Sequence, residues 1–125
     1  MEENRLAAVA VDLCFKIHKR FGPGLFESVY ESIFCHEWEK TGIEIWRQRG
    51  VRVIYDEIDM GIGFIPDLVL GGKLILELKS VDKIAEVHHK QLLTYLRLTN
   101  IKLGLLINFN VPLIKDGITR LVNNL

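Results

Sequence analysis

Two apolar runs on either side of Gly71-Gly72 restrict what this chain can fold into more than any other feature of its sequence. Residues 63–70 and 73–79 are each long enough for one strand, and paired glycines favour the tight turn of a β-hairpin. Successive side chains of a strand point to opposite faces of a sheet. The segment therefore predicts two antiparallel strands that share one apolar face.

Packing alone predicts the register of this hairpin. A two-residue turn would pair Asp67 with Leu76 and place the acidic side chains on opposite faces. A three-residue turn over Gly71–Lys73 instead pairs Asp67 with Glu77. It also keeps one face apolar, through the pairs Leu68–Leu76 and Leu70–Leu74. Because a slip of one residue would turn the apolar face to solvent, we predict the three-residue turn or a compensating bulge.

This register sets two carboxylates side by side, which is unfavourable in a cleft because the charges repel each other and lose solvation. A cation between Asp67 and Glu77 would relieve that repulsion, and Mg²⁺ or Mn²⁺ prefers such oxygen ligands. Lys79 lies two residues beyond Glu77 on the same face, where it could stabilise a developing phosphate oxyanion. The alternative is a hairpin with a polar, solvent-facing side and a Glu–Lys surface pair.

The rest of the chain alternates between helical and extended patterns, which predicts one α/β domain over residues 1–125. A strand hairpin followed by a helix and a buried strand indicates a central mixed four-stranded sheet flanked by helices. The expected elements are helices at 4–20, 25–40 and 83–99, strands at 43–56, 63–70, 73–79 and 102–108, and a short helix after residue 116.

The helix at 83–99 places polar side chains within an apolar arc that we expect to face the sheet and its acidic residues. His88, Gln91 and Tyr95 lie in this arc, and Gln91 and Tyr95 are surface neighbours because they are four residues apart. The alternative is that Tyr95 is an ordinary core aromatic and that Gln91 binds a backbone group. Zinc binding at His88-His89 is disfavoured, because adjacent residues diverge by about 100° on a helix.

Glu27 stands at the start of the helix at 25–40, on the same stripe as Tyr30. The helix dipole favours a negative charge in a first turn, and this alone could explain the residue. The other explanation is that Glu27 adds a carboxylate to the metal site. Gly22 and Gly24, just before it, could let a partner backbone approach.

Composition narrows the function classes. Sixteen basic and sixteen acidic residues cancel, which argues against nucleic-acid binding through bulk charge but permits a local basic surface. No stretch approaches the roughly 20 apolar residues of a membrane helix, and we see no signal peptide. Cys14 and Cys35 are expected to be buried free thiols of a cytoplasmic protein. Motifs of serine hydrolases and phosphate-binding glycine loops do not occur.

Several motifs together resemble one known family. The segment Gly24–Tyr30 reads G-x-x-E-x-x-Y, and the chain resembles the GxxExxY protein family, which is placed in the PD-(D/E)XK nuclease superfamily. The likeness runs nearly end to end. It also rests on Ile17-His18, Gly22–Gly24, Glu77–Lys79, Gln91–Leu98 and Gly104–Pro112.

The resemblance implies a restriction-endonuclease-like fold and a PD-(D/E)XK site. Pro66-Asp67 would be the PD element, and Glu77–Lys79 would be the ExK element. Asp67 and Glu77 would then be metal ligands for Mg²⁺ or Mn²⁺, and Lys79 would be the catalytic lysine.

The resemblance also implies roles outside the hairpin. The backbone carbonyl of Leu78 and the side chain of Glu27 would be further metal ligands. Gln91 and Tyr95 resemble a Q-x-x-x-Y element that helps position metal-bound water or DNA, with Gln91 in the catalytic set. Tyr30, Tyr95 and His88 are expected to support the site.

Three functional hypotheses follow. The first is metal-dependent hydrolysis of phosphodiester bonds, with DNA favoured over RNA as the substrate. The second is a catalytically silent module that retains the nuclease fold and binds nucleic acid or a partner. The third is a structural protein, for example a homodimer that uses exposed aromatic residues such as Trp46 or one that binds an unidentified protein.

Overall fold

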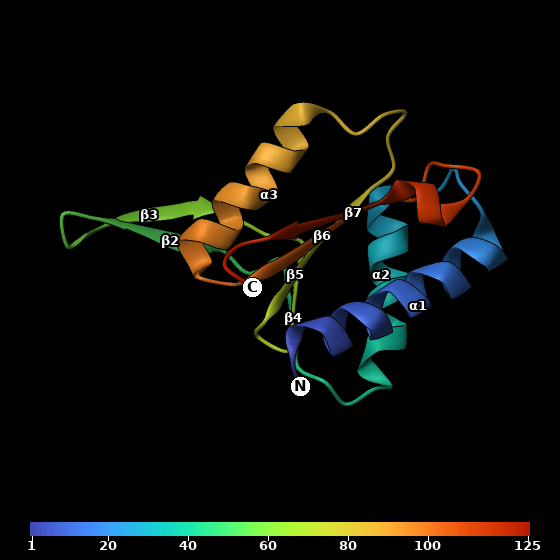
Figure 1. The fold of residues 1–125 in the computed structure, drawn as a ribbon, viewed down its shortest axis with the longest axis horizontal. Helices are drawn as coiled ribbons and strands as arrows, with labels where there is room; N and C mark the ends of the chain where they lie inside the picture. The colour runs from blue at the N-terminus through green and yellow to red at the C-terminus, as the bar shows by residue number, and fades with distance from the viewer.

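A computed structural model describes all of residues 1–125 and shows α-helices on both faces of a five-stranded sheet, with a two-stranded arm standing apart (Figure 1). The elements in chain order are α1 (Glu3–Phe21), α2 (Glu27–Glu39), β1 (Ile45–Arg47), β2 (Val51–Tyr55), β3 (Ile58–Phe64), β4 (Leu68–Leu70), β5 (Leu74–Lys79), α3 (Glu86–Thr99), β6 (Leu103–Asn108), η1 (Ile114–Gly117) and β7 (Ile118–Val122).

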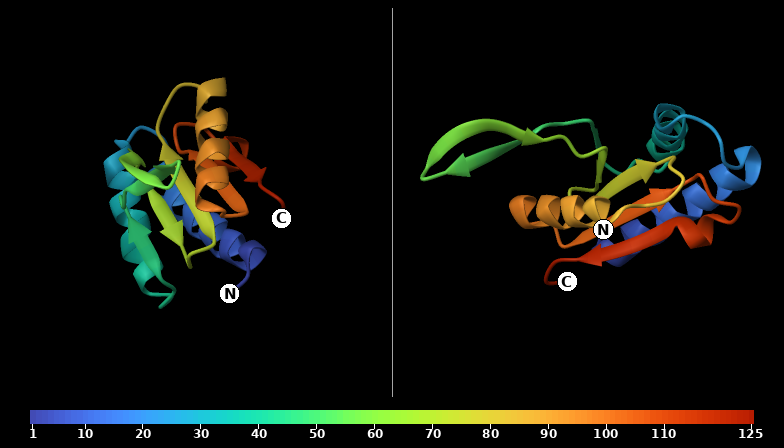
Figure 2. Two further views of the ribbon diagram at one scale, coloured as in Figure 1. Left: turned by 90° about the vertical axis from the view of Figure 1, so that its left-hand side faces the viewer. Right: turned by 90° about the horizontal axis from the view of Figure 1, so that it is seen from above.

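The main sheet has the strand order β1-β4-β5-β6-β7. The β5–β6 pair is parallel and the other pairs are antiparallel, so the predicted mixed α/β architecture is confirmed. Helices α1 and α2 pack on one face of the sheet and α3 packs on the other (Figure 2). None of the helices has the length and apolar character needed to cross a bilayer.

The expected number of strands was too low. The chain after residue 117 forms strand β7 rather than a helix, because the fully buried β6 needs a second hydrogen-bonded neighbour along its edge. The expected strand at 43–56 is split, since Gln48 takes a left-handed φ of 49° that ends β1. The expected strand at 63–70 is broken at Pro66, which has no N–H for a ladder.

The predicted hairpin register is confirmed. Leu68 pairs with Leu76 and Leu70 pairs with Leu74. Gly71 has a φ of 58°, and a Cβ at this position would meet a methyl carbon of Leu6 at 2.9 Å. Glycine is therefore required there both by the turn and by the close approach of α1.

The β2–β3 arm (residues 51–64) pairs only with itself and projects from the body of the molecule (Figures 1 and 2). At its base the ring of Phe64 stacks on Tyr95 of α3, with ring centroids 4.2 Å apart. The strands expected at 43–56 and 63–70 would have placed part of this arm in the main sheet, which is wrong: Val51–Tyr55 pairs instead with Ile58–Phe64, across a turn confined to Asp56-Glu57.

Cys14 and Cys35 are buried free thiols, as expected. Burial raises the pKa of both thiols, and Cys14 has no exposed surface. Because the thiolate is the reactive form, we expect neither cysteine to react with a disulfide reagent in native buffer, whereas both should react in guanidinium chloride. Thiol release followed by absorbance measures this, and rapid labelling of the native protein would contradict it.

Candidate metal centre

The β4–β5 turn brings Asp67 and Glu77 together. Asp67 directly precedes β4, and Glu77 lies within β5. The backbone N–H of Asp67 donates to Glu77 Oε2 at 3.0 Å, and the N–H of Leu78 donates to Asp67 Oδ2 at 2.9 Å. The two carboxylates are therefore neighbours, and a main-chain donor orients each of them.

Glu77 is only 7% exposed, and its pKa is raised to about 9. Burial is the largest cause, followed by repulsion from Asp67 and by a hydrogen bond between the two carboxyl groups. The backbone N–H of Asp67 and the charge of Lys79 lower the pKa by less. A carboxyl group in this environment holds a proton unless another positive charge replaces it.

Lys79 ends β5 on the same face as Glu77 and is half-buried. Its ammonium group forms no ion pair with any carboxylate. The intervening Leu78 points its side chain into the core on the opposite face, with 1% exposure. The Lys79 charge is therefore available beside the acidic pair.

Glu27 lies apart from the acidic pair, at the first residue of α2. Its Oε2 accepts the N–H of Ser80 at 3.1 Å, and Ser80 Oγ donates to the carbonyl of Leu25 at 2.8 Å. A hollow of about 580 Å³ opens beside these residues. The structure contains no convergent group of three His, Cys, Asp or Glu side chains, so it brings Asp67 and Glu77 together without Glu27.

Tyr30 is fully buried and acts on the loop between α1 and α2. Its ring stacks on Phe109 with centroids 4.3 Å apart. Its hydroxyl donates to Gly22 O at 2.5 Å and accepts the N–H of Leu25 at 3.2 Å. These bonds set where α2 begins, and hence where Glu27 stands. No atom lies within 4 Å of a Cβ built on Gly22, so this glycine shapes the loop and does not admit a close backbone approach.

Helix α3 places Tyr95 near the acidic pair and leaves Gln91 in solvent. Tyr95 is half-buried. Burial raises the pKa of its hydroxyl, and the charges of Glu77 and Asp67 raise it further. Gln91 lies one turn earlier on the helix and is exposed.

His88 contributes to the start of α3 and makes no contact with the acidic pair. Its Nδ1 accepts the N–H of Ala85 at 3.0 Å, which satisfies a backbone donor at the helix N-terminus. Leu92 and Leu96 are the only residues of α3 that are buried against the sheet. The apolar arc of this helix is therefore narrower than expected. Val87 is 54% exposed and faces away from the sheet.

A network of side-chain hydrogen bonds connects α2 to Asp67, and the sequence did not predict it. Gln48 Nε2 donates to Glu31 Oε1 at 2.8 Å and to Asp67 Oδ1 at 3.2 Å. Glu31 is 7% exposed, and its Oε2 accepts Arg47 Nε at 2.8 Å. The one signal in the sequence is that Glu31 lies four residues after Glu27, on the same side of α2. No spacing relates Gln48 to Asp67.

This donor set fits a hard divalent cation. Mg²⁺ in proteins commonly binds one or two carboxylates and fills its remaining positions with water and substrate phosphate. Asp67 and Glu77 supply such a pair, and main-chain and amide donors hold it in place. Burial and the charge of Asp67 raise the pKa of Glu77 although Lys79 lies nearby, and a bound cation would offset both effects.

Comparison with known proteins gives one match. A family model described as the PD-(D/E)XK nuclease superfamily matches residues 4–121, which include every candidate residue described above. The narrower resemblance to the GxxExxY family stays a prediction. No curated protein and no solved structure matches the chain significantly.

Proposed function

The chain belongs to the PD-(D/E)XK nuclease superfamily, and from this premise we propose that it is a metal-dependent nuclease that hydrolyses DNA phosphodiester bonds. The observation that carries the proposal is the contact between half-buried Asp67 and buried Glu77 beside an unpaired Lys79. Nucleases of this superfamily generally use divalent metal ions, and two adjacent carboxylates match what Mg²⁺ or Mn²⁺ requires.

Asp67 and Glu77 would hold the metal ion through their carboxylate oxygens. The Leu78 carbonyl would add a main-chain ligand, and Glu27 offers Oε1 because its Oε2 accepts the Ser80 N–H. When bound, Mg²⁺ or Mn²⁺ lowers the pKa of a water molecule and neutralises charge on a phosphate.

The remaining residues act on the substrate and on the attacking water. The half-buried Lys79 ammonium group would stabilise negative charge that develops on the phosphate, because it has no carboxylate partner to neutralise it. Gln91 is exposed on α3, where its amide can orient water or a DNA phosphate. Tyr95 supports the acidic pair from the same helix, held in place by its stack on Phe64.

A second candidate function is a catalytically silent module that binds nucleic acid or a partner protein. The observation that favours it is the position of Glu27, which is bonded to Ser80 and leaves only two acids in direct contact. A site of two carboxylates can bind a cation without supporting turnover. The two functions differ in whether bound DNA is cut.

Cleavage of labelled DNA separates the two functions. Linear, circular and single-stranded substrates are incubated with the protein in Mg²⁺ or Mn²⁺, and matched samples contain EDTA. We expect cleavage that requires the metal. Binding in Ca²⁺ without cleavage in Mg²⁺ or Mn²⁺ would support the silent module, and the absence of both binding and cleavage would reject both the nuclease and a module that binds DNA.

We also propose that Gln48 is a positioning residue for Asp67. Removing its amide in Gln48→Ala should leave Asp67 Oδ1 without its donor, so that only the Leu78 N–H orients this carboxylate, and should leave the buried Glu31 with one partner fewer. Loss of such a supporting contact typically weakens metal affinity by about 10- to 100-fold. Titration calorimetry with Mn²⁺ measures the change without any cleavage assay.

Ser32→Ala is the matched control for this prediction. It removes the hydrogen bond that Arg47 donates to Ser32, at the outer end of the hydrogen-bond network around Glu31. The amide of Gln48 stays in place. The control should bind Mn²⁺ like the wild type. Equal affinity in Gln48→Ala would show that Asp67 needs no such support.

A further inference from the structure

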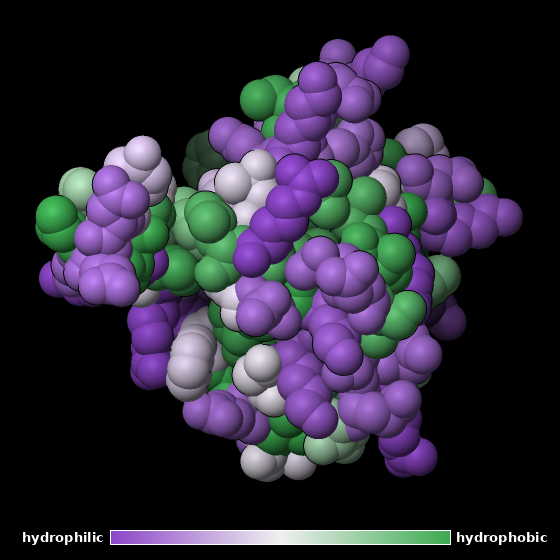
Figure 3. All heavy atoms as spheres, turned by 60° about the vertical axis from the view of Figure 1, so that its left-hand side comes forward, coloured by the Kyte–Doolittle hydropathy of each residue, from purple (hydrophilic) through white to green (hydrophobic).

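The β2–β3 arm exposes hydrophobic side chains that the fold leaves uncovered, and they are visible in green on the lobe beside the body (Figure 3). The exposed fractions are Ile54 61%, Tyr55 65%, Ile58 58%, Met60 57% and Ile62 59%. Trp46, the aromatic residue singled out from the sequence, is exposed as expected, although at 37% it is less exposed than these five, and the guanidinium of Arg49 lies 4.2 Å from its ring. Grouped apolar side chains on a surface mark interaction sites, and a lone two-stranded hairpin is only marginally stable in water.

The tip of the arm carries two acids in an unfavourable turn. Asp56 and Glu57 have φ values of 51° and 64°. A two-residue turn of this kind favours Asn-Gly, because most side chains resist the left-handed conformation. Neither acid forms an ion pair, whereas Asp59 further along the arm pairs with Arg52 at 3.4 Å. These charges repel nucleic-acid phosphates, and they also disfavour direct contact between two tips.

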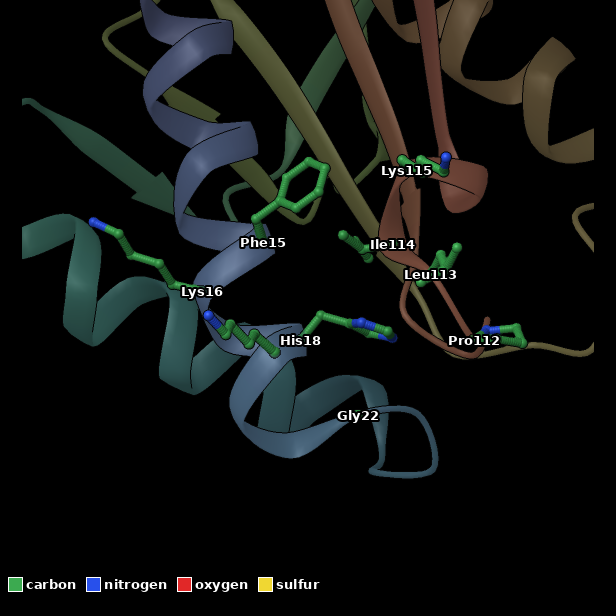
Figure 4. Close-up of a pocket in the computed structure, with 9 residues that line it drawn as sticks. Phe15, Lys16, His18, Gly22, Pro112, Leu113, Ile114 and Lys115 are labelled. Carbon is green, nitrogen blue, oxygen red and sulfur yellow. The ribbon is translucent and has the colours of Figure 1, made fainter.

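A groove at the other end of the molecule has the complementary character. It lies between α1 and the loop before η1, with Phe15 and Leu113 among its apolar walls and a volume of about 470 Å³ (Figure 4). Three lysines also line it. Lys16 pairs with Asp12 at 3.3 Å. Lys19 and Lys115 form no ion pair, so the groove carries two unpaired positive charges where the arm tip carries two unpaired negative ones.

The arm and the groove lie at opposite ends of the long axis, so an arm does not reach the groove of its own chain (Figures 1 and 2). We propose that the arm tip of one copy of this chain docks in the groove of a second copy, and that the second arm docks reciprocally. Asp56 and Glu57 then face Lys19 and Lys115, while Tyr55 enters the apolar part of the groove. A two-fold axis relates the two contacts, which gives a closed dimer.

This dimer is independent of the proposed nuclease function, because neither metal nor DNA takes part in it. Sedimentation velocity over a range of protein concentrations tests it directly. The wild type should form dimers and no larger species, with weaker association at high salt because the contact is charged. A strictly monomeric wild type would overturn the proposal, and mass that keeps rising with concentration would indicate open head-to-tail chains instead.

The double variant Asp56→Asn, Glu57→Gly removes both charges and installs the dipeptide that this turn favours. The arm should therefore stay folded while dimer affinity falls roughly tenfold or more. Val87→Ser is the matched control, since it removes an exposed apolar side chain from α3, away from both surfaces. Unchanged dimerisation in the double variant would reject the tip as the contact.

A charge exchange identifies the partner surface. One variant carries Asp56→Lys and Glu57→Lys, and the other carries Lys19→Glu and Lys115→Glu. Each variant alone should be monomeric, with circular dichroism confirming its fold. An equimolar mixture should dimerise again, because each arm then meets a groove of opposite charge. Failure of the mixture to associate would show that the arm and the groove are not partners.

Discussion

Substituting Glu77 by Gln is expected to abolish metal-dependent DNA cleavage. The amide keeps the shape of the side chain and can still accept the Asp67 N–H, which lies 3.0 Å from Glu77 Oε2. It removes one of the two negative charges of the Asp67–Glu77 pair that would hold the metal. If this ligand contributes several kcal/mol of transition-state stabilisation, cleavage should fall by about a thousandfold or more. Asp67→Asn should have an effect of the same size.

Comparison with Lys79→Ala separates metal binding from charge stabilisation. Both acidic-pair variants should lose Mn²⁺ affinity in calorimetry as well as cleavage. Lys79→Ala should lose cleavage but keep Mn²⁺ binding, because the ammonium group repels the cation and does not hold it. Glu39→Gln, at an exposed position on α2, is the control that should leave both measurements unchanged. Full cleavage activity in Glu77→Gln would remove the acidic pair from the mechanism.

The second large effect that we expect is a change in the free energy of unfolding with pH when no divalent metal is present. The pKa of Glu77 is about 9 in the folded protein, against an ordinary value of 4.5. Between these pH values the folded protein holds a proton that the unfolded chain releases, so the free energy of unfolding falls as pH rises. Each pKa unit corresponds to about 1.4 kcal/mol, so the loss between pH 4.5 and pH 7 is about 3 kcal/mol.

Urea unfolding in EDTA at a series of pH values measures this loss. Glu77→Gln carries no titrating group at this position, so its stability should change less over the range and should exceed that of the wild type above pH 7. Mg²⁺ should restore wild-type stability at high pH by taking the place of the proton, and should not affect the variant. A wild-type stability that is flat between pH 5 and pH 8 in EDTA would contradict the raised pKa.

Hairpin pairing could be predicted from the sequence because only one register is consistent with an apolar face. Leu68, Leu70 and Leu74 cannot be buried together in any other alignment of the two strands. The same register placed Asp67 beside Glu77. Helices α1, α2 and α3 were also predictable, since their apolar residues recur at helical spacing and the segment Gly22–Gly24 ends α1.

The edges of the sheet could not be predicted, because a short segment takes its structure from its neighbours. Residues 118–122 form a strand only because β6 presents unpaired backbone groups beside them. The arm at residues 51–64 likewise reads as part of a sheet, since its alternating pattern does not reveal that it pairs only with itself. Gln48 lies in a left-handed conformation that no local residue pattern indicates.

Local periodicity was enough to predict helices α1, α2 and α3, and one tight turn was enough to predict which two acids face each other. Contacts between residues far apart in the chain were decided by tertiary structure. The fold brings Gln48 and Glu31 to Asp67, and it ties Glu27 to Ser80 instead of to the acidic pair. The physical reason is that a hydrogen bond across 53 residues depends on how helix and sheet pack, whereas a pair across a tight turn depends only on the turn and its apolar face.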